Sequence, residues 1–504
     1  MAPVSRCRAR GRLPAARVGV VIPGRGHLDA AWFLPAIDAP GGFLILQGWF
    51  STVGPPHPPV TAQLRLDGRP FRFACEEPRP DVAAADPAFA TQSGFDVTLR
   101  LDAAPAERHL RLDFVAAGTP CAELEGTIAD PTQEVEARAA TLPPRRLYKL
   151  RNLILNERER LSHVAQVTAL PVTGQIDPSF GCNLRCPLCQ SHMIREQGYR
   201  LPNLKLDQLR AILDRYGEGL VRIWLSLWGE PLLNKQLAEA VRLCKAHDIW
   251  VMISSNMSVP LGDAAITALV ESGLDTIMLS LDGATQATYQ EYRREGDLVL
   301  ALDNLRRLAA ARRRLGMRTP YLYWRYLEFP WNRQEIAAAR RLAAEAGADE
   351  FGVEPGVMTP QMTFSLAPRG RQVARAVAPE LLESWHGLAA RRAAQHKYFG
   401  CDYLYSAISV NSNGLVHPCC YVVAPGDAVG DAVGDAAARL RNAPVLRSAR
   451  AALATVAAGA PGAVRAHAPC AACPVVASCD GHVVTQTGFR QLYEYLLHGT
   501  GIRW

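Results

Sequence analysis

Three cysteines within one short segment carry the clearest chemistry of this sequence. Cys182, Cys186 and Cys189 have the spacing C-x₃-C-x₂-C. Thiolates are the soft ligands that iron–sulfur clusters require, and three of them can hold three irons of a cubane while the fourth iron keeps an open site. A structural zinc site is the alternative, but it needs four ligands, and the next candidate along the chain is His192. We therefore predict an iron–sulfur cluster on this segment.

The elements around this segment follow a regular strand–helix rhythm. Strands are predicted at 175–178, 221–227, 250–254, 276–281, 321–327 and 350–353, and helices at 206–216, 236–247, 262–272, 298–315 and 333–346. Repeated strand–helix units predict an α/β domain with a parallel sheet, here a partial (β/α)₆ barrel, whose chemistry lies at the C-terminal ends of the strands. The cysteine segment directly follows the first strand. Asn332 and Glu335 have the spacing of a capping box at the start of the last helix.

Four further motifs end successive strands or open the helix that follows. They are Trp228-Gly229-Glu230-Pro231, Ser254-Ser255-Asn256, Ser280-Leu281-Asp282-Gly283 and Tyr292-Arg293. Together with the cysteines they resemble the radical S-adenosylmethionine (SAM) superfamily in order and placement over residues 175–355. The family's Gly-Gly-Glu-Pro motif begins here with Trp228 in place of glycine.

The resemblance implies a cofactor set and roles for individual residues. A 4Fe–4S cluster on Cys182, Cys186 and Cys189 would bind the amino and carboxylate groups of SAM, and reductive cleavage would yield methionine and a 5′-deoxyadenosyl radical that abstracts hydrogen from the substrate. Glu230 or the backbone around Gly229 would accept hydrogen bonds from the amino group, and Arg293 would pair with the carboxylate. The ribose would be held by Ser280, Asp282 and either Ser255 or Asn256.

The C-terminal cysteines resemble a second family feature, the auxiliary-cluster extension called the SPASM domain. The resemblance implies an auxiliary 4Fe–4S cluster on Cys401, Cys419, Cys470 and Cys473, as in the shortened twitch version, because the position of a further cysteine is Val483 here. Cys420 and Cys479 remain spare, and either could replace one of the four. A zinc site with four cysteine ligands is the alternative.

The chain divides into four predicted segments. Residues 18–135 form an all-β accessory domain, since alternating apolar positions at Val60–Leu66 lead through an Asp67-Gly68 turn into a second strand, as in a β-sandwich. Residues 136–173 form a linker with a helix at 147–161. Residues 174–384 form the barrel, and residues 385–504 form the cysteine-rich SPASM- or twitch-like domain, which closes with a helix at 489–497.

Composition excludes several classes of protein. The 504 residues are 49% hydrophobic and 20% charged, as in a globular chain. No apolar run approaches the ~20 residues of a membrane span, and Met1–Arg17 is not followed by the apolar stretch of a secretory signal, so we expect a cytoplasmic protein. The net charge of +7 is spread along the chain, and its densest cluster, Arg312-Arg313-Arg314, has the setting of a solvated helix face, so no nucleic-acid partner is expected.

The expected partners and substrate follow from resemblances to known families, not from the spacing of the cysteines. It implies a flavodoxin- or ferredoxin-type reductant. A loose likeness of the β-rich segment to domains beside bacterial glycosyltransferases favours a small-molecule or glycan substrate, a carbohydrate or glycoconjugate that is oxidised, dehydrated or epimerised. The first alternative is a SPASM-type maturase that modifies a peptide or protein. The alternative of another class is a non-catalytic metal-cluster protein that binds glycans.

Overall fold

The computed structural model describes residues 24–356, 401–457 and 489–499 with short gaps. The gaps are 55–56, 76, 79–81, 83–85, 87, 91, 107, 188, 197, 402, 421 and 423–424. The predicted ligands Cys470 and Cys473 and the spare Cys479 lie outside the described residues. The chain separates into two compact units, one formed mainly by residues 44–129 and the other mainly by residues 130–504.

The strands that the structure describes in the first unit form two sheets, which agrees with the predicted β-rich character of this part of the chain. One sheet has the order β1 (Gly24–Pro35), β2 (Gly42–Thr52), β6 (Gln92–Leu101) and β5 (Glu77–Pro78), and the other has the order β4 (Arg69–Ala74), β3 (Val60–Leu66), β7 (His109–Ala116) and β8 (Thr119–Thr127). Aromatic rings join the two sheets, because Phe50 of β2 stacks on Phe114 of β7 with centroids 4.2 Å apart. Asp67 and Gly68 both have positive φ and make the predicted hairpin turn.

The second unit contains a nine-stranded sheet. Six consecutive strands of this sheet, from one edge to its interior, correspond to the strands predicted for the barrel. They are β9 (Thr173–Ile176), β10 (Arg222–Trp224), β11 (Trp250–Ser255), β12 (Thr276–Ser280), β13 (Tyr321–Glu328) and β14 (Glu350–Pro355). All neighbouring pairs from β9 to β14 are parallel. Among the described strands the sheet is open, with β14 at one edge and β17 at the other, so no closed barrel is formed.

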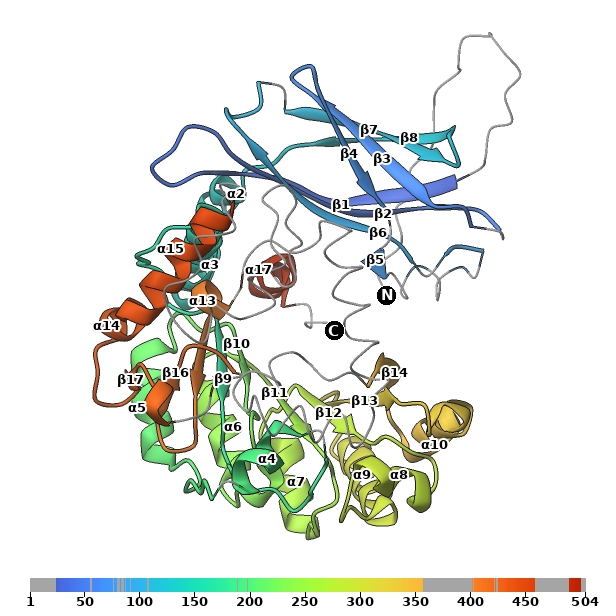
Figure 1. The fold of residues 1–504 in the computed structure, drawn as a ribbon, viewed down its shortest axis with the longest axis vertical. Coiled ribbons are helices and arrows are strands. Elements are labelled where there is room, and N and C mark those ends of the chain that lie inside the picture. Colours follow the sequence, from blue (N-terminus) through green and yellow to red (C-terminus); the bar gives the residue numbers. More distant parts are fainter. Residues whose placement is uncertain are drawn as a thin grey trace. The chain divides into compact units, whose positions relative to one another are not determined.

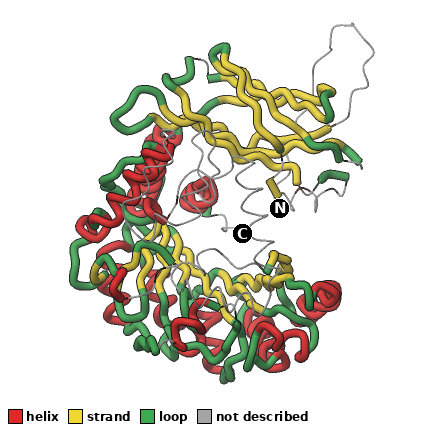
Figure 2. The backbone as a smooth tube through the Cα atoms, in the orientation of Figure 1, coloured by secondary structure: helices red, strands yellow, loops and turns green. Residues whose placement is uncertain are grey.

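Helices cover one face of this sheet (Figure 1; Figure 2). They are α5 (Leu206–Tyr216), α6 (Leu237–Ala246), α7 (Asp263–Glu271), α9 (Leu298–Arg314) and α10 (Ile336–Ala346). Alternate strand residues such as Ile253, Ile277 and Trp324 belong to the hydrophobic core shared with these helices. Because side chains alternate across a strand, Ser254, Met278 and Arg325 lie on the opposite, inner face.

The C-terminal segment extends the same sheet. β15 (Ala407–Val410) pairs in parallel with β9, with Ser409 opposite Gln175, and β16 (Leu415–His417) and β17 (Gly430–Asp431) follow antiparallel. The helices of this segment are α13 (Tyr403–Ser406), α14 (Ala437–Arg441), α15 (Pro444–Ala457) and α17 (Phe489–His498). Strand β9, which leads into the cysteine loop, is therefore an interior strand of the sheet.

The segment predicted as a linker, residues 136–173, contains helix α3 (Pro144–Leu161), and helix α2 (Pro131–Ala137) lies mostly at the end of the segment predicted as all-β. Lys149 of α3 is fully buried. Its ammonium group donates to the carbonyl oxygens of Leu220, His247 and Asp248 at 2.6, 2.8 and 2.9 Å. These three hydrogen bonds fix α3 to the loops that precede β10 and β11. None of the described helices is long and apolar enough to cross a membrane.

The predicted capping box is wrong. The side chain of Asn332 makes no capping bond and binds instead the carbonyls of Asp282 and Leu327 and the N–H of Phe329. Glu335 accepts hydrogen bonds from Ala284 and Thr285, at the start of helix α8 (Gln286–Tyr292). The long-range partners outcompete the local ones because they satisfy buried backbone groups of the next loop.

Candidate functional site

The cysteine loop is held against the end of the neighbouring strand β10 by a close backbone approach. A Cβ atom on Gly229 would lie 1.6 Å from the carbonyl oxygen of Ser179 and 2.5 Å from that of Gly181, so only glycine fits there. The N–H of Glu230 donates to the carbonyl of Gly181 at 2.8 Å. The Gly-Glu-Pro motif therefore positions the loop that carries the thiols.

The three thiols lie in an environment that suits a negatively charged cluster. Cys186 is buried, and Cys182 and Cys189 are half-buried. The Asn256 amide donates to the Cys182 sulfur at 3.8 Å, and the Arg293 guanidinium donates to the Cys186 sulfur at 3.9 Å. Hydrogen bonds to cluster sulfurs tune reduction potential and stabilise the charge of the bound thiolates.

Burial dominates the acid–base properties of these thiols in the metal-free chain. It raises the pKa of Cys182 to about 11 and that of Cys186 to about 12, although Arg293 acts in the opposite direction on Cys186. A coordinating metal deprotonates a thiol outright, so cluster binding would release these protons. The thiols therefore fit metal ligation better than free nucleophilic reactivity.

The three thiols lie close enough together to interact electrostatically, since Cys182 and Cys189 both raise the pKa of Cys186. In a 4Fe–4S cluster each cysteine ligand binds a different iron, and the cluster on these three thiols stays a prediction.

The Glu230 side chain connects the segment after β10 to the end of β11 by hydrogen bonds. Its carboxylate is buried and accepts hydrogen bonds from the Ser255 hydroxyl at 2.8 Å and from the N–H groups of Asn256 and Leu232 at 2.8 and 3.0 Å. Burial raises the pKa of Glu230 to about 7, against the effect of these donors. Three internal donors bind the carboxylate, and the choice between Glu230 and the backbone around Gly229 for the amino group of SAM stays a prediction.

Asp282 and Arg293 form a buried ion pair beside the cysteine loop. The Arg293 guanidinium lies 2.5 Å from one oxygen of the fully buried Asp282, and the other oxygen accepts from the N–H of Leu327 at 2.8 Å. Asp282 therefore joins the end of β12 to the end of β13 and orients Arg293 toward Cys186. The predicted residues of both motifs are brought together at the C-terminal edge of the sheet, although their roles toward SAM remain predictions.

Hydroxyl groups form a row along the inner face of three neighbouring strands. The Ser254 and Ser280 hydroxyl oxygens are 3.2 Å apart, and the N–H of Ser254 donates to the Ser226 hydroxyl at 2.9 Å. Ser255, by contrast, is turned toward Glu230 and the N–H of Met257. Of the predicted ribose contacts, Ser280 thus lies on the inner face, whereas Ser255 is used within the loop.

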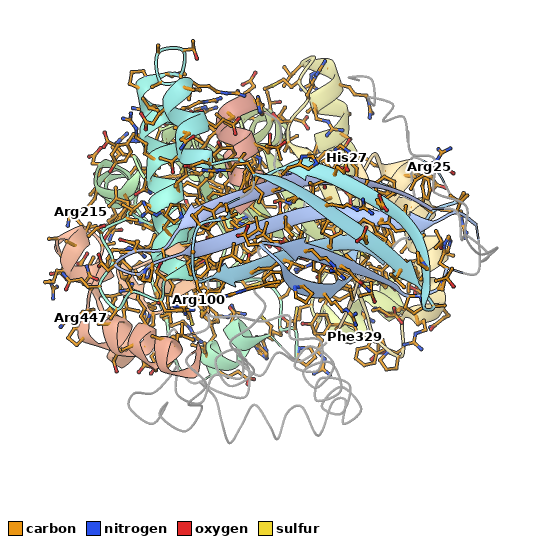
Figure 3. The ribbon with its side chains drawn as sticks, turned by 90° about the horizontal axis from the view of Figure 1, so that it is seen from above. Arg25, His27, Arg100, Arg215, Phe329 and Arg447 are labelled. Carbon is orange, nitrogen blue, oxygen red and sulfur yellow. The ribbon has the colours of Figure 1, made fainter. Side chains whose placement is uncertain are left out.

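An aromatic wall beside the cysteine loop joins Tyr292 of the predicted motif to two residues that were not predicted, Phe329 and Trp331. Phe329, labelled in Figure 3, stacks on Trp331 with centroids 4.6 Å apart and contacts Tyr292 at 4.7 Å. Cys182 and Cys189 pack against the apolar cluster that contains Phe329 and Tyr292. Such a wall limits access of water to the thiols, and its sequence signal is the aromatic run after β13.

Asp177 is a second unpredicted residue of the site. It directly follows β9, is fully buried, and accepts hydrogen bonds from the N–H groups of Trp228 and Gly229 at 3.2 and 3.4 Å. Its other carboxylate oxygen has no hydrogen-bond partner among the described residues. Burial raises the pKa of Asp177 to about 7. Its sequence signal is an acidic residue immediately after the first apolar strand.

Replacing Asp177 with asparagine should stabilise the metal-free protein in a pH-dependent way. The folded-state pKa lies above the unfolded value of 3.8, so the wild-type chain loses stability as pH rises from about 4 to about 7. Asparagine keeps the acceptor oxygen and carries no charge, so the gain should grow across this range and reach up to about 4 kcal/mol above pH 7. Urea unfolding at pH 5 and pH 8 measures it. Asp207→Asn, on the exposed side of α5, is the matched control, and an equal gain at both pH values would contradict the assignment.

A hollow of about 510 Å³ lies beside the cysteine loop. It is lined by Gly181, Cys182, Asn183, Leu184, Arg185, His192, Arg195, Glu196, Arg200 and Glu295. Arg195 supports the loop, because its guanidinium donates to the carbonyl of Leu184 at 3.1 Å. His192 lies beside Glu196 at 3.4 Å and not in a ligand position.

The C-terminal cysteines that the structure describes differ in their surroundings. Cys401 and Cys419 are half-buried. Cys420 is buried and hydrogen-bonded with Tyr403 and Gln175, and burial raises its pKa to about 12. His417 is buried, and its Nε2 lies 3.0 Å from the amide of Asn411. These contacts favour Cys419 over Cys420 as a ligand, while the complete auxiliary set stays a prediction.

The fold and the thiol loop define a parallel α/β domain that carries its chemistry on a three-cysteine loop after the first strand. Residues 176–323 match the sequence model of the Radical SAM superfamily. Residues 176–323 thus form a radical SAM domain, and the cofactors of that superfamily are a 4Fe–4S cluster and SAM.

Individual relatives are similar over shorter stretches. The chain is 34% identical over 108 residues to the GTP 3′,8-cyclase of Chlorobaculum tepidum, covering 21% of this chain and 32% of that protein. It is 25% identical over 127 residues to the PqqA peptide cyclase of Rhodopseudomonas palustris, covering 25% of this chain and 33% of that protein. The chain thus spans about a third of the length of these relatives.

Among solved structures, SuiB of Streptococcus suis bound to the precursor peptide SuiA is similar with 15% sequence identity and a TM-score of 0.45. The match covers 70% of this chain and 83% of that one.

Proposed function

We propose that this protein is a radical SAM enzyme that modifies a peptide or protein substrate. The observation that carries the proposal is the loop of Cys182, Cys186 and Cys189, which is held on glycine-specific backbone contacts and receives side-chain donors at two of its sulfurs. A cluster bound there would supply the electron that cleaves SAM and so generates the radical that takes hydrogen from the substrate.

The chain's own residues would perform four tasks. Gly229 and Glu230 hold the loop against β10 and β11, and Asn256 donates to a cluster sulfur. Arg293, oriented by Asp282, brings a positive charge next to Cys186, where a bound carboxylate would be stabilised. Ser280 presents a hydroxyl on the inner face for the ribose. The aromatic wall of Tyr292, Phe329 and Trp331 excludes water from the thiols.

The substrate class rests on the relatives. One of them is by name a cyclase of a peptide and another a cyclase of GTP, and neither name supports the carbohydrate or glycoconjugate expected from the β-rich segment. The peptide-modifying alternative is therefore the better-supported one, and we adopt it in place of the carbohydrate prediction.

An auxiliary cluster and a protein reductant complete the proposal. Cys401 and Cys419, with Cys470 and Cys473, would bind the second 4Fe–4S cluster of a SPASM- or twitch-like segment. The arginine-rich hollow beside the cysteine loop supports electron delivery by a flavodoxin- or ferredoxin-type protein, since Arg185, Arg195 and Arg200 line it near Cys182.

The test is iron and sulfide analysis of anaerobically reconstituted protein, with low-temperature EPR and dithionite-driven formation of 5′-deoxyadenosine from SAM. We expect about eight irons per chain, an EPR signal that SAM perturbs, and deoxyadenosine. About four irons with one zinc would keep the enzyme and make the C-terminal site structural. Zinc alone without SAM cleavage would refute the proposal and favour a non-catalytic binding protein.

A further inference from the structure

A charged pair lies on the inner face of the sheet, next to the predicted SAM site and outside every motif described above. Arg325 occupies the middle of β13, between Trp324 and Tyr326, which both belong to the helix-facing core. Alternation along the strand therefore places Arg325 on the inner face. Two residues further along the same face, the N–H of Leu327 donates to Asp282. Arg325 therefore lies two residues before the strand position that contacts the Asp282–Arg293 ion pair.

The guanidinium of Arg325 is under-satisfied. Its Nε is buried and has no hydrogen-bond partner among the described residues, and its one ion pair there, to Glu354 of β14, is long at 3.9 Å. The Arg325 side chain is 27% exposed and that of Glu354 is 48% exposed. Buried polar groups are normally hydrogen-bonded, so an arginine held in this way points to an acceptor beyond the described residues, which a bound substrate can supply.

Residues of the two strands next to β13 contact or adjoin Arg325 and its ion-pair partner Glu354. Tyr323, on the same face of β13, has its hydroxyl bonded to Glu354, and that hydroxyl would lie 2.2 Å from a Cβ on Gly352. Gly352 is the register partner of Arg325, so its missing side chain leaves room for this contact. On the other side, Arg325 is the register partner of Ser280, at the end of the serine row.

The chemistry of such a pocket selects a carboxylate. Arginine presents a planar fork of donors that matches the two oxygens of a carboxylate, and a charge-assisted bidentate pair is strong and oriented. The serine hydroxyls and Tyr323 add neutral polar contacts beside it. Glu354 repels a second negative charge, which disfavours a multiply charged phosphate chain at the same place.

We propose that Arg325, positioned by Glu354 and Tyr323, binds a carboxylate of the peptide substrate, either an acidic side chain or a C-terminus, and so places the substrate beside the bound SAM. This inference rests on the proposed function and names the part of the substrate that the site recognises. Arg325 is a binding residue in this scheme, and Glu354 and Tyr323 are positioning residues.

Binding of short probes to the reconstituted protein with SAM tests the inference. The probes are acetyl-Gly-Glu-Gly-amide and its neutral counterpart acetyl-Gly-Gln-Gly-amide, followed by ligand-detected NMR titration. We expect the acidic peptide to bind at least about tenfold more tightly to the wild-type protein, and Arg325→Met to abolish this preference. Arg325→Lys should retain part of it, because the charge remains and the fork is lost. Arg210→Met, on the exposed face of α5, is the matched control and should leave the preference intact.

Three results would overturn the inference. Equal binding of the two peptides to the wild-type protein would show that no carboxylate is selected. Loss of SAM binding in Arg325→Met would make Arg325 a SAM ligand instead. Binding of GTP that depends on Arg325 and exceeds that of the acidic peptide would assign the site to a phosphate group. The proposed function is tested separately, because SAM cleavage by the wild-type protein is measured without either peptide and does not depend on the peptide preference.

Discussion

Replacing Cys186 with alanine should remove the first cluster and abolish SAM cleavage. Cys186 is the most buried of the three thiols, and its loss leaves two cysteine ligands and an Arg293 charge without its sulfur partner. We expect the iron content to fall by about four per chain, the SAM-sensitive EPR signal to disappear, and 5′-deoxyadenosine to become undetectable. Iron analysis, EPR and chromatography of the reaction mixture measure the three effects.

Cys244 provides the matched control for this substitution. It is fully buried on α6, within the core between helices and sheet, and contributes to no motif of the site. Cys244→Ala should cost some stability through a small cavity and leave iron content and SAM cleavage unchanged. If Cys186→Ala kept a full complement of iron and cleaved SAM, the cluster would have to be bound elsewhere.

Replacing Gly229 with alanine should disrupt the site without removing any polar group. The new Cβ would meet two backbone carbonyl oxygens, of Ser179 and Gly181, and backbone cannot rotate away as a side chain can. Either the cysteine loop or the Gly-Glu-Pro segment must shift, which breaks the bond between the Glu230 N–H and Gly181. We expect destabilisation of about 2 kcal/mol, within the range of overpacked sites, and poor cluster reconstitution.

Urea unfolding and iron content of the reconstituted protein measure this effect. Gly262→Ala is the control, because a Cβ at Gly262 meets nothing within 4 Å and its φ is negative. The two alanine variants should differ clearly in both readouts. Equal behaviour would mean that the loop tolerates displacement and that the close approach at Gly229 has no role in holding it.

Much of the barrel could be predicted because its signals are local. Short apolar runs between amphipathic helices indicated all six parallel strands, and helix α5 spans Leu206–Tyr216, the predicted residues. The Asp67-Gly68 turn was predictable for the same reason, since the positive φ values it needs are a property of those two residues. The motifs at the strand ends gathered at one edge because parallel strands all end on the same side.

What could not be predicted depends on partners distant in sequence. Spacing predicted a capping box for Asn332 and Glu335, but their partners lie near residues 282–285 and 327–329. Likewise, the motif gave no indication that the Glu230 carboxylate accepts hydrogen bonds from Ser255 and Asn256 at the end of the next strand. The inner-face position of Arg325 could not be predicted either, because the local sequence does not indicate whether a charged side chain in a strand is exposed or buried.

Because β9 pairs with β15, one side of β9 stays unpaired during synthesis until the C-terminal segment has been made. β9 is complete by residue 176, yet its second neighbour is made only when residues 407–410 have been synthesised. Until then the strand that leads into the cysteine loop is an exposed edge, with unpaired backbone groups along one side. The segment that matches the superfamily therefore cannot complete its own sheet, and the edge beside the cysteine loop is covered only when the C-terminal segment has been made.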